Sequence, residues 1–224
     1  MSITWIIIIA MLGAGLAAQA WVRRAHKKGS DVRVSSGLTG AQAARVVLDG
    51  EGLSSVPVER VPGQLTDHYD PRSRTVRLSE STFDHPTPAA LAIATHEVGH
   101  AIQHAQASAF FRLRSAVAPA AMVAQWGWFA LLMIGVLLGA VGFVWMAIAV
   151  YLIVIAFHVV TLPVEFDASR RAGQLMQRYQ LVTAGEAQQT KSVLTAAAST
   201  YVVAAISSVA LLLAYVLPML GGRE

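Results

Sequence analysis

Long apolar runs alternate with polar stretches along the 224-residue chain. The first run, residues 3–22, has no charged residue, and residues 193–220 form another at the opposite end. Between them, residues 115–163 are nearly uncharged and are long enough for two crossings joined by a turn near residues 139–142. A membrane-spanning helix needs about 20 apolar residues. The pattern therefore predicts a mainly α-helical integral membrane protein with about four transmembrane helices.

Basic residues indicate on which side of the membrane the polar segments lie. Arg23, Arg24, Lys27 and Lys28 directly follow the first apolar run. In a cleaved export signal the positive residues come first, so this run is expected to be a membrane anchor. Cytoplasmic segments are enriched in Lys and Arg. We therefore expect a multi-pass protein of the prokaryotic cell membrane, with both termini outside and the polar segments in the cytoplasm.

The polar segment after the first span has the pattern of a small α+β unit. Residues 56–61 and 75–79 alternate like half-buried strands, and residues 71–74 have the composition of a hairpin turn. We expect these strands to form a small antiparallel sheet. Thr87 and Pro88 then have the residue types that favour the N-cap and first position of a helix.

Composition agrees with a membrane protein and limits its chemistry. Hydrophobic residues make up 55% of the chain and charged residues only 13%, which is low for a soluble domain. With no cysteine, any metal must be held by His, Asp or Glu. The net charge of +4 does not indicate nucleic acid, because the basic residues flank apolar runs and face lipid head groups there. The expected partner is the lipid bilayer.

One helix carries ionisable residues at a spacing that metal chemistry requires. His96 and His100 are four apart, so both imidazoles lie on one face of a helix and can bind the same ion. Glu97 lies on the flank of that face, where its carboxylate can take a proton from a water molecule at the ion. His-Glu-x-x-His is the signature of zinc proteases, and Zn²⁺ is the expected cofactor. The alternative is a solvated helix with two histidines.

A catalytic zinc ion normally has three protein ligands, so a third must come from elsewhere. His104 lies one turn beyond His100, too far along the helix to complete the site, and is expected beside a ligand or at the surface. His158 falls within a span, where a structural role is the alternative to a functional one. The extended signature, with Gly at 103 and His at 106, is absent because both positions are Gln.

Glu165 is the strongest candidate for the third ligand. It follows the second span of the predicted hairpin and returns to the membrane side of the motif helix. An ion pair with Arg170 or Arg171 is the alternative interpretation. Asp167 points in another direction around the helix, where it could orient a ligand histidine through the ring nitrogen that does not bind the ion.

Three stretches together resemble a known family: His96-Glu-Val-Gly-His100-Ala-Ile-Gln, Leu65-Thr-Asp-His68-Tyr-Asp-Pro71 and Thr161-Leu-Pro-Val-Glu165-Phe-Asp-Ala-Ser-Arg-Arg171. They are similar to the YugP-type zinc-dependent membrane proteases, a neutral zinc metallopeptidase family, over essentially the whole chain. More distantly, the layout resembles the HtpX and CAAX-prenyl-protease group. The resemblance implies that His96, His100 and Glu165 bind the metal and that Glu97 is the general base. The distant group has an acidic residue four positions after its ligand glutamate, where this chain has Ser169.

The cluster from Asp67 to Asp70 is a further candidate feature. We expect His68 and Tyr69 to lie on an edge strand near the site, where either could donate a hydrogen bond to the oxyanion of a tetrahedral intermediate. The same strand could align a substrate by backbone pairing. An additional metal site and a simple polar turn before Pro71 are the alternatives. Tyr201 is a weaker donor candidate, for which an interfacial aromatic is the other interpretation.

The sequence as a whole predicts a membrane zinc endopeptidase whose active site faces the cytoplasm at the membrane surface. Its expected substrates are membrane-associated or misfolded polypeptides. A non-proteolytic zinc-binding scaffold or chaperone, or an intramembrane-cleaving protease, are the rival functions. The expected segments are an anchor (1–22), a cytoplasmic zincin-like catalytic segment (23–115), a transmembrane hairpin (116–162), a cytoplasmic segment with the third metal ligand (163–192) and a C-terminal transmembrane helix (193–220).

Overall fold

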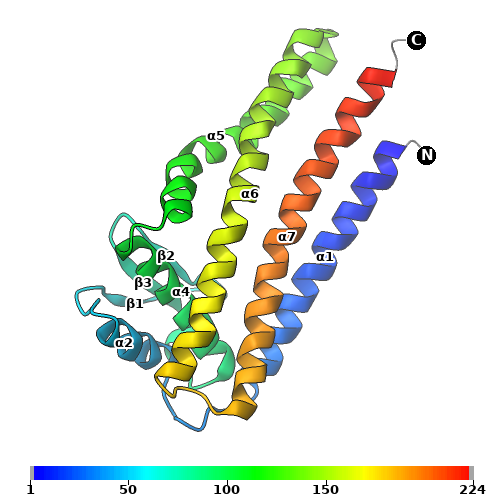
Figure 1. Cartoon of the computed structure of the whole chain (residues 1–224). Helices are drawn as coiled ribbons and strands as arrows, with labels where there is room; N and C mark the ends of the chain where they lie inside the picture. Colours follow the sequence, from blue (N-terminus) through cyan, green and yellow to red (C-terminus); the bar gives the residue numbers. More distant parts are fainter. Residues whose placement is uncertain (1–2, 222–224) are drawn as a thin grey trace.

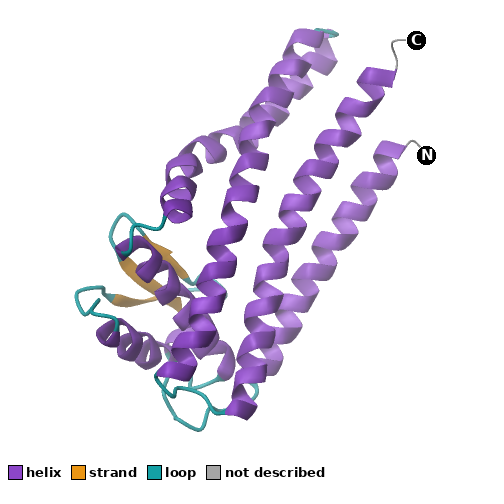
Figure 2. Ribbon diagram, viewed as in Figure 1, coloured by secondary structure: helices purple, strands orange, loops and turns teal. Residues whose placement is uncertain are grey.

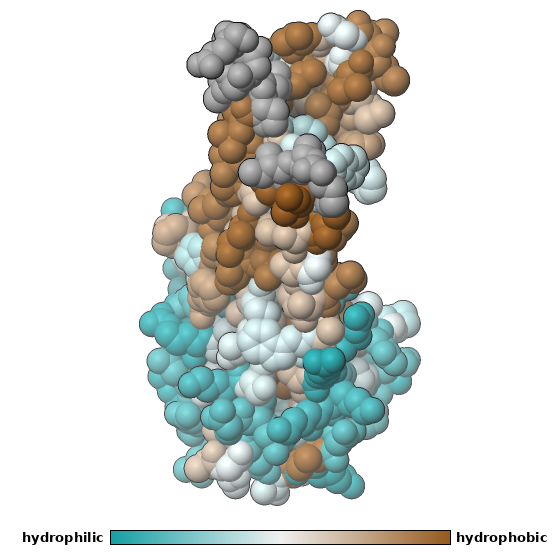
Figure 3. Space-filling model, turned by 90° about the vertical axis from the view of Figure 1, so that its right-hand side faces the viewer, coloured by the Kyte–Doolittle hydropathy of each residue, from teal (hydrophilic) through white to brown (hydrophobic). Residues whose placement is uncertain are grey.

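Four long helices dominate the computed structural model, which describes residues 3–221 (Figure 1). All four are long and apolar enough to span a membrane, which confirms the predicted fold class. Hydrophobic residues cover the upper part of the molecule and hydrophilic residues the lower part (Figure 3). Both ends of the described chain lie at the hydrophobic end (Figure 1). The four helices are α1 (Ile3–Ser30), α5 (Ala109–Leu138), α6 (Val141–Arg178) and α7 (Ala184–Gly221).

The turn between α5 and α6 falls where the glycines predict it. Gly139 follows the last residue of α5 with a φ of 62°, in the left-handed region that glycine adopts without strain. However, α6 does not end at the proline that follows the apolar run. It continues through Pro163 to Arg178 as one helix, so Glu165 lies inside the helix and its direction is fixed by the helix backbone.

The hydrophilic part is a compact α+β unit at the base of the four long helices (Figure 2). Its core is built from side chains of α2, β3, α4 and α6 that are almost completely buried, among them Leu48, Leu78, Leu91, Val98 and Met176. The elements of this unit are α2 (Gly40–Gly50), β1 (Val58–Val61), β2 (His68–Asp70), β3 (Thr75–Ser79), α3 (Glu80–Phe83) and α4 (Pro88–Ala105).

The predicted antiparallel sheet is wrong in one respect, because the sheet is mixed. Its strand order is β1-β3-β2. The turn at residues 71–74 joins β3 to the adjacent β2, so these two strands are antiparallel. β1 instead pairs with β3 in parallel, with Val58 opposite Val76. The three-residue β2 is too short to give an alternating pattern. The sequence therefore suggests that the turn joins β3 to β1 instead of to β2.

A close crossing of α4 and α6 places the motif helix against the second transmembrane hairpin helix. A Cβ added at Gly99 would lie 3.0 Å from the backbone oxygen of Ala168 and 3.3 Å from its Cα. Only small residues permit backbones to approach this closely. The crossing brings the face of α4 that carries the two histidines opposite the face of α6 that carries Glu165.

Candidate metal centre

The two motif histidines lie on the face of α4 that meets α6. The helix begins as its sequence predicts, with the Thr87 hydroxyl accepting a hydrogen bond from the backbone N–H of Ala90 and with Pro88 in the first turn. The rings of His96 and His100 are nearly perpendicular, with centroids 4.8 Å apart. Their Nε2 atoms therefore converge on one point beside the helix.

Glu165 reaches this point from α6. Its Oε2 lies 3.2 Å from His96 Nε2 and 3.6 Å from His100 Nε2. One potential ligand atom from each of the three residues lies within 4.8 Å of the others. The predicted ion pair of Glu165 with Arg170 or Arg171 is not formed, because both arginines bond to Asp167.

The surroundings of Glu165 fit a bound cation. Its side chain is only 1% exposed, and Oε1 has no hydrogen-bond partner among the described residues. The Arg114 guanidinium is 3.5 Å from Oε1. A buried carboxylate requires compensation for its lost hydration, and a metal ion between the three groups would supply it. Two imidazoles and one carboxylate form a donor set typical of catalytic zinc sites, so these residues fit zinc.

A hydrogen-bonded chain holds His100 in position. His100 Nδ1 lies 2.9 Å from Gln103 Oε1. Gln103 Nε2 donates at 2.9 Å both to the carbonyl of Val164 and to Asp167 Oδ2. Since the amide nitrogen faces two acceptors, the amide oxygen must face His100, which leaves Nε2 of that ring for the metal. Asp167 thus acts on the histidine through Gln103, a residue that the sequence analysis did not assign.

Ser169 holds the other histidine. Its Oγ lies 3.2 Å from His96 Nδ1, so the ring nitrogen opposite Glu165 has a hydrogen-bond partner. Ser169 is the position at which this chain departs from the acidic residue of the more distant group. Both candidate histidine ligands therefore have their Nδ1 bound by side chains and their Nε2 turned toward Glu165.

Glu97 is buried next to His96, and burial raises its pKa to about 7. The neighbouring His96 lowers this pKa, whereas the nearby carboxylates of Glu165 and Asp67 raise it further. A carboxyl group with a pKa near neutrality can both accept and donate a proton at physiological pH.

Two cavities meet at the motif. One of about 290 Å³ extends from the α+β unit (α2 to α4, called the soluble unit below), where Asp67 and Arg72 line it, to Met122 of α5 and Phe157 of α6. The other, of about 150 Å³, lies between α1, α4 and α7. Both are lined by Asp67, His96, Glu97 and Tyr201. Glu97 is therefore accessible from two sides.

The remaining sequence candidates lie at different distances from this centre. His68 is exposed, bonds to the carbonyl oxygen of Thr66 and lines the larger cavity. The Tyr69 hydroxyl is 2.9 Å from His104 Nδ1, so these two side chains engage each other. Burial raises the pKa of Tyr69 and lowers that of His104. Neither His104 nor His158 belongs to the group of possible ligands found among the described residues.

Tyr201 and Arg114 contribute more to the site than their sequence positions indicate. Tyr201 lines the larger cavity together with Glu165, and it also lines the smaller one. The sequence analysis gave Arg114 no role, yet its guanidinium lies 3.5 Å from Glu165 Oε1. The sequence signal for this role is the position of Arg114 between the motif helix and an apolar run. A cation at that position can reach a metal site near the membrane surface.

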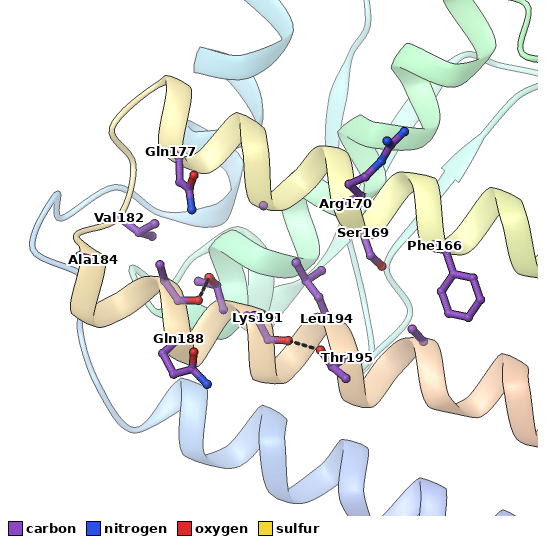
Figure 4. Close-up of a pocket in the computed structure, with 14 residues that line it drawn as sticks. Phe166, Ser169, Arg170, Gln177, Val182, Ala184, Gln188, Lys191, Leu194 and Thr195 are labelled. Carbon is purple, nitrogen blue, oxygen red and sulfur yellow. Dashed lines mark hydrogen bonds between the residues drawn. The ribbon is translucent and has the colours of Figure 1, made fainter.

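A separate groove of about 510 Å³ lies between the lower halves of α6 and α7. Figure 4 shows Ser169 and Phe166 on α6 facing α7, while the Arg170 side chain extends away from α7. The groove contains none of the candidate ligands and shares no lining residue with the 290 Å³ cavity. It approaches the centre at Ser169 and shares Leu194 with the 150 Å³ cavity.

Comparison with known proteins agrees with this geometry. The profile of a family described as "Putative neutral zinc metallopeptidase" matches residues 4–220. The chain belongs to this family. A relative in this neutral zinc metallopeptidase family, named "Putative membrane protease YugP" in Bacillus subtilis (strain 168), is 42% identical over 216 residues, or 96% of each chain. No solved structure matches the chain.

Proposed function

We propose that the chain is a zinc-dependent endopeptidase of the prokaryotic cell membrane, with its active site at the cytoplasmic surface. The observation that carries this proposal is the convergence of His96, His100 and Glu165 from α4 and α6, with Glu97 beside them in a cavity. Membership of a zinc peptidase family supports it. When bound, zinc would activate a water molecule and polarise the scissile carbonyl group.

Glu97 is assigned as the general base and then the general acid. Its carboxylate takes a proton from the attacking water and returns a proton to the nitrogen of the leaving group. The raised pKa suits both steps, since the group changes protonation state near pH 7. None of the hydrogen bonds between described side chains involves Glu97, so its carboxylate is available for this exchange.

The outer edge of β2 is assigned as the guide for the substrate backbone. Within the described residues, β2 is an edge strand that pairs only with β3, and its His68 and Tyr69 line the larger cavity beside Glu97. An extended peptide can add to such an edge by backbone hydrogen bonds. His68, Arg114 and Tyr201 line the cavity and are the candidate donors for the oxyanion. The side chain of Tyr69 is not among them, because His104 engages its hydroxyl.

The site is assigned to the membrane surface, not to the bilayer centre. The larger cavity is lined on one side by polar residues of the soluble unit, such as Asp67 and Arg72. On the other side it is lined by Met122 and Phe157 of the spanning helices. This combination suits polypeptides that lie at or emerge from the membrane, including misfolded ones, and it argues against intramembrane cleavage.

Substitution of the base tests the proposal. Glu97→Gln should retain stoichiometric zinc but lose about 10²–10⁴-fold in the rate of cleavage of an unfolded membrane-protein substrate. Glu80→Gln is a matched control, because Glu80 is exposed on α3 and lines neither cavity. Equal cleavage by the two variants would refute the role of Glu97.

Removal of the third ligand separates an enzyme from a scaffold. Glu165→Ala should lose zinc during dialysis that leaves wild-type protein fully loaded, and it should lose cleavage as well. Full retention of zinc would remove Glu165 from the site. Zinc-loaded wild-type protein that cleaves no polypeptide would favour the non-proteolytic scaffold.

A further inference from the structure

The smaller cavity at the motif has no assigned role in the proposed reaction. It measures about 150 Å³ and shares only part of its lining with the 290 Å³ cavity. The shared residues Asp67, His96, Glu97 and Tyr201 form its wall toward the metal centre. Away from that wall one lining residue, His26 of α1, is polar, and the other six are apolar: Val22, Leu65, Ile93, Val193, Leu194 and Ala197.

The size and lining of this cavity suit one apolar side chain. A protein cavity of about 150 Å³ lined by aliphatic residues holds a benzene-sized group. Leu, Ile, Val, Met and Phe side chains are of this size or smaller, whereas Trp is larger. A charged side chain would lose its hydration against the six apolar residues, which disfavours it.

The course of residues 65–72 connects this cavity with the larger one. Leu65 lines the smaller cavity and Asp67 lines both, whereas the larger cavity is lined by His68, Tyr69, Pro71 and Arg72. A peptide paired with this segment would therefore extend from one cavity into the other, with Glu97 between them. Antiparallel pairing is the more stable arrangement. In that direction, the part of the peptide after the scissile bond runs toward Leu65.

We propose, building on the proposed endopeptidase function, that the 150 Å³ cavity is a specificity pocket for the residue that follows the scissile bond and that it selects medium-sized apolar side chains. Its far wall comes from Val22 of α1 and from Val193, Leu194 and Ala197 of α7. The N-terminal transmembrane helix thus contributes to substrate selection as well as to anchoring. Substrates are polypeptides with an apolar residue at that position near the membrane surface.

A substitution that fills the pocket tests this assignment. Ala197 is on α7 and lines only the smaller of the two cavities, so Ala197→Leu occupies part of its volume. Zinc-loaded wild-type protein in detergent is given a mixture of unstructured peptides, and the cut positions are mapped by mass spectrometry. Wild type should cut before Leu, Ile, Val, Met or Phe. Ala197→Leu should shift the preference toward Ala and Gly at that position by about tenfold or more.

Ala118→Leu is the matched control. Ala118 lies on α5 and lines only the larger cavity, so it should change the preference before the scissile bond and leave the preference after it intact. Leu194→Ala enlarges the pocket and should admit Trp, which provides a second variant if Ala197→Leu does not fold.

The outcomes separate the two proposals. The pocket assignment is overturned if cleavage shows no preference for the residue after the scissile bond. It is also overturned if that preference responds to Ala118→Leu and not to the two pocket variants. In both cases the proposed endopeptidase function still stands. Failure of zinc-loaded wild-type protein to cleave any peptide overturns the endopeptidase, and the pocket with it.

Discussion

Gln103 links the two helices that supply the candidate ligands. It accepts from His100 and donates to the Val164 carbonyl and the Asp167 carboxylate, and its side chain is almost fully buried. Rotation of its amide would break three hydrogen bonds in an environment without competing water. The orientation of the His100 ring is therefore set by an uncharged residue that does not contact the metal itself.

Substitution of Gln103 should weaken metal binding without removing a ligand. We expect Gln103→Ala to lower zinc affinity by about 10–100-fold, because the His100 ring loses the partner that orients it. The measurement is competition for zinc with a chelator of known affinity. Gln106→Ala is the control, since Gln106 is exposed and its side chain contacts only Arg171 among the described hydrogen bonds. Equal affinities of the two variants would contradict the role of Gln103.

Asp70 gives the β2–β3 turn a dependence on pH. It accepts hydrogen bonds from Arg77, Arg72 and Ser73, and the bond from Arg77 is the main reason that its pKa lies well below the usual range. Because the pKa of Asp70 is lower in the folded state than in the unfolded chain, its ionised carboxylate stabilises the folded state at pH values above the unfolded pKa of about 4. That stabilisation is lost as the pH falls toward the lower folded value.

Asp70→Asn should consequently unfold at a lower temperature than wild type at pH 7. The difference should persist down to about pH 5 and shrink below pH 4 as the wild-type carboxylate is protonated. Thermal unfolding in detergent at several pH values measures it, and the effect should be small because the group is partly exposed. A difference that grows on acidification would have the wrong sign for this explanation.

Sequence spacing finds residues that share a helix and misses partners on different helices. His96, Glu97 and His100 follow from a four-residue period, which dictates a common face. The bonds of Gln103 to Asp167 and of Ser169 to His96 depend on how α4 crosses α6, and no local pattern contains that information. Glu165 was a candidate ligand from its position after the membrane hairpin and from a family resemblance, and its alternative partners Arg170 and Arg171 instead bond to Asp167.

At the scale of elements, the site depends on the separation of α4 from α6. Each helix carries part of the candidate ligand set, and at Gly99 a Cβ would meet the backbone of Ala168 on α6. The apolar runs predicted the long helices because their length far exceeds what a soluble protein tolerates at its surface. An edge strand at His68 and Tyr69 was expected, and β2 confirms it, but its pairing with β3 was not predicted because three residues are too few to establish a period of two.

Gly99→Val should separate the two helices and open the site. The added side chain would collide with the Ala168 backbone, which we expect to cost roughly 1–3 kcal/mol in stability and to lower zinc affinity. Thermal unfolding and zinc content measure the two effects. Gly173→Ala is the control on α6, because a Cβ there meets nothing within 4 Å; it should be neutral or slightly stabilising. Wild-type zinc affinity in Gly99→Val would refute the dependence.

At the scale of the whole molecule, the soluble unit and the α5–α6 turn lie at opposite ends of the long helices (Figure 1). The basic cluster at Arg23 and Arg24 lies toward the soluble end of α1. If the positive-inside rule holds for this chain, the soluble unit is expected to face the cytoplasm, as proposed above. Hydrophobicity alone cannot decide this orientation, since an inverted molecule would bury the same surface.

Single cysteines can test the orientation directly, because the chain has none of its own. In intact cells, a membrane-impermeant thiol reagent should label Ala140→Cys, in the α5–α6 turn, and should not label Ser73→Cys, in the β2–β3 turn. In inside-out vesicles the two results should be exchanged. Labelling of Ser73→Cys in intact cells would place the soluble unit outside.

The division of the ligand set between α4 and α6 has a mechanical consequence. A metal ion bound there joins two points about 65 residues apart in the chain, much as a disulfide would, and restricts the unfolded chain accordingly. One of those points belongs to the soluble unit and the other to a membrane helix. A bound ion would thus be a reversible cross-link between the soluble unit and a membrane helix. The zinc supply of the cell would then affect the stability of this attachment as well as the rate of cleavage.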